Sequence, residues 1–375
     1  MDTSSRSLKP FAASSIDGGV ASTKPAAAPV VARFGMLTRF HAGYFRISLA
    51  LSGQALLWRT LSDASTDPRA LGPVVRSLPS AAFVLLWSLA LLTLVALCAL
   101  YAARCLLRFP AVRAEFRHHV AMNYLFAPWI PWLLAPAAGA AVGPPARTRA
   151  PTARSGGRSR CPSWALDVKV YGQWFTRGRK FLSMVANPAS HITVIGNLVT
   201  ARAAARMGWH EGAVAMFAVG AAHYLVLFVT LYQRFLGSDS LPAMLRPVFF
   251  LFFAAPSMAS LAWDAISASF DTCCKMLFFL SLFLFASLVS RPTLFKRAMR
   301  RFSVAWWAYS FPLTVLALAA AEYAQEVREV AASVLMLALA ILSVAVTLAL
   351  MVFTVLRTND LLPHDDPFSC PPLAR

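Results

Sequence analysis

The sequence predicts an all-α membrane protein, and three observations carry this prediction. Of the 375 residues, 58% are hydrophobic and only 14% are charged, with a mean hydropathy of +0.60, which is more apolar than a soluble domain of this size. Apolar runs of about 20 residues, the length that crosses a bilayer as a helix, recur between about residues 42 and 355. The stretch 331–355 contains no charged residue. We therefore expect a multi-pass protein.

Nine apolar segments are clear candidates for membrane-spanning helices, and a tenth, doubtful segment ends near Phe175. The nine fall at about 40–61, 79–104, 119–136, 187–207, 212–233, 245–267, 272–290, 302–323 and 331–356. If the doubtful segment is counted and the N-terminus lies in the cytosol, most Lys and Arg residues fall in inside loops and tails. This distribution predicts ten spans with both termini cytosolic.

The two ends of the chain differ from its apolar middle. Residues 1–35 are rich in Ser, Ala and Pro and lack the hydrophobic core of a signal peptide, so we expect a disordered cytosolic tail. Their poverty in acidic residues leaves a transit peptide as a weaker alternative. Residues 36–357 form the predicted transmembrane channel domain, and 358–375 form a second cytosolic tail.

Small and polar residues recur at three- and four-residue spacing in the odd-numbered spans, which places them on one helix face. Even-numbered spans, such as 276–290, read as apolar all round, and the cores of the even spans lack the prolines found in odd ones. This alternation predicts five helical hairpins, with odd helices in an inner ring around a central pore and even helices outside. The candidate pore-lining residues are Gly43, Arg46, Ala50, Gly53, Ser190, Thr193, Asn197, Ser257, Ser260, Ser310 and Thr314.

A path lined by hydroxyls and amides, with almost no carboxylate, suits a weakly bound anion. The alternative is that small polar residues only allow helices to pack closely. Arg46 is the basic residue placed deepest in a clear span, where it either faces a hydrated mouth or extends to the cytosolic interface. We expect Asp264 to cap a helix or pair with a cation.

Several other classes of function are disfavoured. The net charge of +19 comes from basic residues dispersed among loops, so we expect no nucleic-acid partner. The six cysteines lack metal-ligand spacing, and no phosphate-binding loop or catalytic motif is present, so we expect neither a metal, nor a cofactor, nor an enzyme. His191 and His223 are candidates for proton coupling, with hydrogen bonding between helices as the alternative.

Several stretches of the chain resemble the plant slow-type anion channels, which are distant relatives of the bacterial tellurite-resistance/dicarboxylate transporters. They include FHAGYFRISLALSGQALLW (40–58), NPASHITVIGN (187–197) and FSVAWWAYSFPLT (302–314), and the resemblance covers about 36–357 apart from one gap. The short N-terminal tail is similar to that of the short-tailed homologues of the guard-cell channel.

The resemblance implies ten helices as five hairpins, assembly as a homo- or hetero-trimer with one pore per subunit, and conduction of chloride and nitrate across the plasma membrane. It also implies a phenylalanine in the ninth helix that plugs the pore. The matching position is Phe311, next to a predicted kink at Pro312. A regulatory protein kinase is a further implied partner. Some short-tailed subunits are silent alone and act by joining a conducting relative.

The sequence departs from the family at residues 137–163, a basic stretch rich in Pro and Gly that replaces the end of the third helix and most of the fourth. No lipid-spanning helix can form from such residues. An altered reading frame or splice choice would explain the stretch, and sequencing the transcript tests this. We expect a gated, passive anion channel subunit. The alternatives are a non-conducting regulatory subunit and a proton-coupled dicarboxylate transporter that uses His191 or His223.

Overall fold

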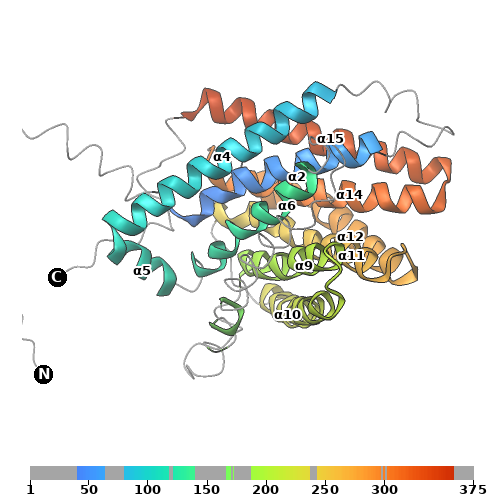
Figure 1. The fold of residues 1–375 in the computed structure, drawn as a ribbon, viewed down its shortest axis with the longest axis horizontal. Coiled ribbons are helices and arrows are strands. Elements are labelled where there is room, and N and C mark those ends of the chain that lie inside the picture. The colour runs from blue at the N-terminus through green and yellow to red at the C-terminus, as the bar shows by residue number, and fades with distance from the viewer. Residues whose placement is uncertain are drawn as a thin grey trace, which may run out of the picture.

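Helices make up every regular element in the part of the chain that the computed structural model describes (Figure 1). The described residues are 40–63, 80–117, 121–139, 166–169, 172, 187–236, 243–296, 299 and 302–358. Six of the described helices are long and apolar enough to cross a membrane. They are Ala81–Leu107, His210–Gln233, Arg246–Ser267, Thr272–Val289, Val304–Val327 and Val330–Leu356. The prediction of an all-α membrane protein is confirmed.

Five helices pack in a closed ring, which we call the inner ring. In chain order they are α2 (Phe45–Asp63), α6 (Trp129–Gly139), α9 (His191–Arg206), α11 (Leu251–Ser267) and α14 (Ser310–Val327). Each contacts the next helix in this order, and α14 contacts α2 again. The inner ring therefore closes around an axis.

Four further helices lie outside the inner ring, namely α4 (Ser80–Leu107), α10 (His210–Leu236), α12 (Thr272–Val289) and α15 (Val330–Leu356). Each packs mainly against the ring helix that precedes it in the chain, so each pair forms a helical hairpin. Within the apolar window of α14, 94% of residues are buried, against 11% in that of α4. The outer helices thus present the surface that lipid would cover.

Each ring helix is preceded by a short 3₁₀ segment. These segments are η1 (Ala42–Tyr44), η3 (Ala121–Phe126), η4 (Pro188–Ser190), η5 (Ala243–Phe250) and η7 (Val304–Ala308). They contact one another in the same closed order as the helices that follow them. We call this end the N-terminal end of the ring and the opposite one its C-terminal end. Two short helices, α5 (Phe109–Arg117) and α13 (Thr293–Lys296), follow outer helices that end there.

The prolines of α14 and α11 are accommodated in different ways. Pro312 is the third residue of α14, in the first turn, where a helix leaves backbone N–H groups without acceptors in any case. The chain passes from η7 to α14 just before Phe311, and the kink expected at Pro312 stays a prediction. Pro256 lies inside α11, and the carbonyl of Phe252, four residues earlier, accepts a hydrogen bond from the Tyr224 hydroxyl of α10 at 3.5 Å.

Three of the sequence-based domain predictions fall largely outside the described residues. These are the tail at 1–35, the tail at 358–375 and the anomalous stretch at 137–163. Of the fourth predicted span, only residues 166–169 and 172 are described. The count of ten spans accordingly stays a prediction.

Candidate functional site

Phe311 lies against a glycine of the neighbouring ring helix. Its side chain is 3% exposed, and a Cβ atom added to Gly53 of α2 would come within 3.4 Å of the Phe311 Cδ2 atom. The same Cβ atom would lie 3.3 Å from Cγ2 of Thr314, one turn further along α14. The Phe311 ring therefore fills the space left by the missing side chain of Gly53, where α14 meets α2.

A second phenylalanine has the same relationship to a glycine. Phe126, at the end of η3, lies against Gly196 of α9, where an added Cβ atom would come within 3.2 Å of the Phe126 Cδ1 atom. Phe126 is 1% exposed. Our sequence analysis did not single out Phe126 or Gly196, although the Ala127–Pro128 dipeptide that follows Phe126 belongs to the proline pattern of the odd spans.

Four of the predicted pore-lining hydroxyls form hydrogen bonds with outer helices. Ser310 and Thr314 of α14 pair with Thr347 and Ser343 of α15, at 2.6 and 3.0 Å between hydroxyl oxygens. Ser260 of α11 donates to the Cys274 carbonyl of α12 at 2.9 Å, and Ser257 pairs with the Ser281 hydroxyl on the same outer helix. These hydroxyls join two of the ring helices, α11 and α14, to their hairpin partners.

Gln54 joins several of these hydroxyls in one hydrogen-bonded group. Its side-chain nitrogen lies 2.9 Å from the Thr314 hydroxyl, 2.7 Å from that of Ser343 and 2.8 Å from that of Thr347. All four residues are buried. The Gln54 amide thus connects α2 with both helices of the last hairpin.

The predicted residues of α9 connect ring helices and the remnant of the fourth span. The Asn123 side chain of η3 donates to Ser190 and accepts from Thr193, both at 3.3 Å. Asn197 donates to the buried Asp167 carboxylate at 3.0 Å. Ala50 of α2 is fully buried in an apolar cluster with other hydrophobic side chains.

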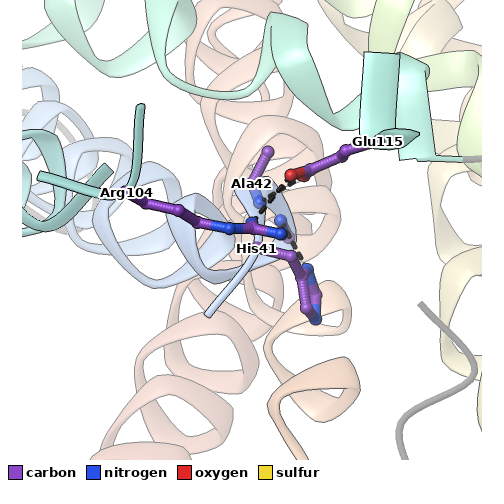
Figure 2. Close-up of polar contacts among 5 residues, drawn as sticks. His41, Ala42, Arg104 and Glu115 are labelled. Carbon is purple, nitrogen blue, oxygen red and sulfur yellow. Dashed lines mark hydrogen bonds and ion pairs between the residues drawn. The ribbon is translucent and has the colours of Figure 1, made fainter. Parts of the chain in front are cut away.

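Arg46 and an ion pair occupy the N-terminal end of the ring. The buried Arg46 donates from Nε to the Gly43 carbonyl at 2.8 Å, and its guanidinium carbon lies 4.7 Å from the centre of the Tyr124 ring. Figure 2 shows that Glu115 of α5 reaches the backbone N–H of Ala42, at 2.8 Å. Arg104 of α4 pairs with the same carboxylate at 2.7 Å.

Neither histidine that we considered for proton coupling is near the solvent. His191 is fully buried, and its Nδ1 donates to the Pro188 carbonyl at 3.1 Å. The centre of its ring lies 4.5 Å from the centre of the Phe252 ring. His223 is fully buried on the outer helix α10. Among the described residues, no group of three or more His, Cys, Asp and Glu side chains is arranged to hold a metal ion.

Comparison with known proteins identifies the family to which the chain belongs. A family model described as "Voltage-dependent anion channel" matches residues 39–355, which is most of the chain. The chain belongs to this anion channel family. Members are channels and not enzymes, so the expectation that this chain is not an enzyme is confirmed.

Curated relatives in this family come from Arabidopsis thaliana. The chain is 52% identical to S-type anion channel SLAH1 over 347 residues, which is 92% of this chain and 88% of that protein. It is 49% identical to S-type anion channel SLAH4 over 343 residues, which is 92% of this chain and 90% of that protein. Guard cell S-type anion channel SLAC1 is 40% identical over 334 residues, covering 88% of this chain and 58% of that protein. The resemblance to slow-type anion channels is confirmed.

In an anion channel, buried cations at the ends of the ring are residues of interest, and our sequence analysis missed one of them. Arg202, near the C-terminal end of α9, lies 3.8 Å from Glu322 of α14 and is also buried. Arg202 lies inside the span expected at 187–207, but it is not on the polar stripe from which the pore-lining residues were chosen. The sequence contains no signal that would join Arg202 to a residue 120 positions away.

Proposed function

We propose that this chain is a subunit of a slow-type anion channel that passes chloride and nitrate passively across the plasma membrane. In this proposal, the helices form five hairpins, of which the second has a truncated fourth helix, and both termini lie in the cytosol. Membership of the anion channel family and the closed inner ring support it. The ring also has an apolar exterior, formed by helices such as α4 and α15, that suits a bilayer.

Phe311 is the gate in this proposal, and one observation carries the assignment. The ring of Phe311 lies against the bare backbone of Gly53, where the ring helices α14 and α2 meet. On the side of Gly53 the Phe311 ring has no neighbouring side chain to displace. We propose that the ring moves toward this side when the path opens.

We base the proposed ion path on Gly43, Arg46 and Gly53 of η1 and α2 and on Thr193 of α9. Among the other predicted pore-lining residues, the hydroxyls of Ser257, Ser260, Ser310 and Thr314 already have partners on α12 and α15. We propose that these four hold the hairpins together and that they do not bind the passing ion.

The gate assignment is tested with Phe311→Ala. We expect a higher basal anion current in a cell that also expresses a conducting relative, because the shortened side chain no longer fills the space beside Gly53. The matched control is Phe278→Ala, which removes a fully buried ring from the outer helix α12. An unchanged current from Phe311→Ala at normal surface expression would contradict the assignment. Reversal potentials that follow the anion gradient alone, without a shift with pH, separate this channel from a proton-coupled dicarboxylate transporter.

A second candidate function is a non-conducting regulatory subunit that assembles with related channel subunits as a trimer. The basic, Pro-rich sequence at 137–163 favours it, because that sequence cannot form the fourth span. The test compares three measurements of anion current, from the chain alone, from the chain with a long-tailed relative, and from a version with an apolar fourth span restored. Current from the unaltered chain alone would exclude this candidate.

A further inference from the structure

Arg46 is a buried cation whose orientation is fixed by two contacts. Its side chain is on the first turn of α2, at the N-terminal end of the ring, and is 3% exposed. The Nε atom donates to the Gly43 carbonyl, and the guanidinium plane lies over the ring of Tyr124. Both terminal nitrogens, Nη1 and Nη2, are buried and have no hydrogen-bond acceptor among the described residues.

A guanidinium group has five N–H donors, and leaving them buried without acceptors costs free energy. A carboxylate would be the usual partner, and Glu115 lies at the same end of the ring. However, its two oxygens are engaged by Arg104 at 2.7 Å and by the Ala42 N–H at 2.8 Å (Figure 2). Because Arg104 neutralises Glu115, the charge of Arg46 is not compensated there.

The backbone donors at the start of η1 are also engaged, so they do not form an anion site of their own. The Gly43 N–H donates to His41 Nδ1 at 3.0 Å, and the Tyr44 N–H donates to the His41 carbonyl at 3.2 Å. Gly43 leaves room for this arrangement. An added Cβ atom would lie 2.5 Å from His41 Cε1 and 2.9 Å from Arg46 Nη2.

We propose that Arg46 forms a binding site for a small inorganic anion at the N-terminal end of the ring. This inference rests on the proposed function and adds a binding step to it at one mouth of the path. Nitrate is planar, and two of its oxygens match the parallel N–H groups of Nη1 and Nη2, whereas chloride offers a single acceptor centre. The site therefore binds nitrate more tightly than chloride.

The experiment measures thermal unfolding of the purified full-length protein in detergent. Nitrate or chloride replaces gluconate at constant ionic strength, and the midpoint is followed as a function of anion concentration. A ligand that binds the folded state raises the midpoint in a saturable way. We expect saturation with both anions, at a lower concentration for nitrate.

Three substitutions locate the effect. Arg46→Gln raises the half-saturating concentration by about tenfold or more, as expected when hydrogen bonds to a charged group are lost. Arg46→Lys retains the charge and loses the paired donors, so it removes the preference for nitrate. Arg117→Gln, the matched control, removes the same charge from an exposed position of α5 and leaves both titrations as in the wild type.

Glu115→Gln is expected to strengthen anion binding, whereas Arg46→Gln weakens it. This test can be made even if the Arg46→Gln variant does not fold. The glutamine oxygen can still accept from the Ala42 N–H, but Arg104 then becomes a second uncompensated cation. We expect half-saturation at a lower anion concentration. An unchanged titration in both Arg46→Gln and Glu115→Gln would overturn the proposal.

This readout is independent of conduction. If no anion current is found but Arg46→Gln raises the half-saturating anion concentration as expected, the binding site stands and the channel proposal fails. If currents are normal and the shift is insensitive to Arg46, the channel proposal stands and the binding site fails.

Discussion

Arg202 of α9 and Glu322 of α14 lie 3.8 Å apart, although α11 separates their helices in the ring. Both residues are close to the C-terminal ends of their helices, so the pair connects non-adjacent helices at the end opposite to Arg46. The Arg202 side chain is 5% exposed, and that of Glu322 is 22% exposed. If the pair is broken, water can therefore solvate the Glu322 carboxylate more easily than the Arg202 guanidinium.

This difference predicts unequal effects of removing either charge. Glu322→Gln removes the ion-pair partner of a buried guanidinium and leaves Asp264 as the remaining acidic group that acts on it. We expect a loss of about 1–2 kcal/mol, reduced from the usual cost of breaking a buried pair by Asp264 and by the partial exposure of Glu322. Arg202→Gln leaves a carboxylate that water can reach, so the loss is smaller. Thermal unfolding midpoints of both variants and of the double variant measure the coupling. Equal losses from the two single variants would contradict this account.

The contact between Gly53 and Phe311 predicts that the two positions are coupled. In Gly53→Ala, the new methyl group comes within 3.4 Å of the Phe311 ring and 3.3 Å of Thr314, so these two side chains have to move by a few tenths of an ångström. We expect Gly53→Ala to alter basal anion current in the wild-type background. The effect should be smaller when Phe311 is already alanine, because of its two close neighbours the methyl group then meets only the Thr314 side chain. Additive effects in the double variant would show that Gly53 acts through another neighbour.

The long helices are the features that the sequence predicts best, because the length of an apolar run is set by the thickness of the bilayer. The span expected at 272–290 is α12 (Thr272–Val289), and the one expected at 331–356 is α15 (Val330–Leu356). The 3₁₀ segments were not predicted, since over three to eight residues a repeat of 3.0 cannot be told from one of 3.6. Helix α5 is not predicted because it is short and charged, whereas the prediction of helices rests on long apolar runs.

The candidate site was predicted less well than the helices. A polar stripe predicts which residues share one face of a helix, but it does not predict which other helix packs against that face. Thr314 and Ser310 are on the expected stripe, yet their partners are on α15, in the span that looked purely apolar. The reading of 276–290 as apolar all round is also wrong at Ser281, which is fully buried and donates to the Phe253 carbonyl at 2.7 Å. The partners of Arg46 and Arg202 depend on how side chains of different helices are placed, and the spacing of residues along the sequence does not predict this.

Gln54 predicts a measurable contribution of polar contacts to stability. Its amide donates to hydroxyls of α14 and α15 that give their own protons to backbone carbonyls, as Thr314 does to Ser310 and Thr347 does to Ser343. Gln54→Leu removes this donor: the Thr314 and Thr347 oxygens keep their contacts with the Ser343 and Ser310 hydroxyls, but the buried Ser343 oxygen loses its amide donor. We expect a loss of about 1–2 kcal/mol, read from the unfolding midpoint in detergent. Gln233→Leu, at an exposed position of α10, is the matched control. A loss from Gln54→Leu no larger than that of the control would contradict this role.

Asp271 predicts a pH-dependent contribution at the start of α12. Its Oδ1 accepts from the Cys274 N–H and its Oδ2 accepts from Trp263 Nε1, both at 3.0 Å. Slight burial raises the pKa of this carboxyl, but these hydrogen bonds outweigh it and hold the pKa below its ordinary value. A carboxyl with a lowered pKa in the folded state stabilises the protein above its unfolded pKa of about 4, and the contribution is lost as the pH falls through the folded pKa.

We therefore expect Asp271→Ala to cost about 1–2 kcal/mol at pH 7, as the loss of a helix cap does, and the difference from wild type to shrink as the pH is lowered below about 4. The matched control is Glu329→Ala, because Glu329 is the N-cap residue of α15 and its side chain makes no capping hydrogen bond. Unfolding midpoints at a series of pH values provide the measurement. A difference between Asp271→Ala and wild type that stays constant down to pH values well below 4 would mean that the Asp271 side chain acts by packing and not as a charged cap.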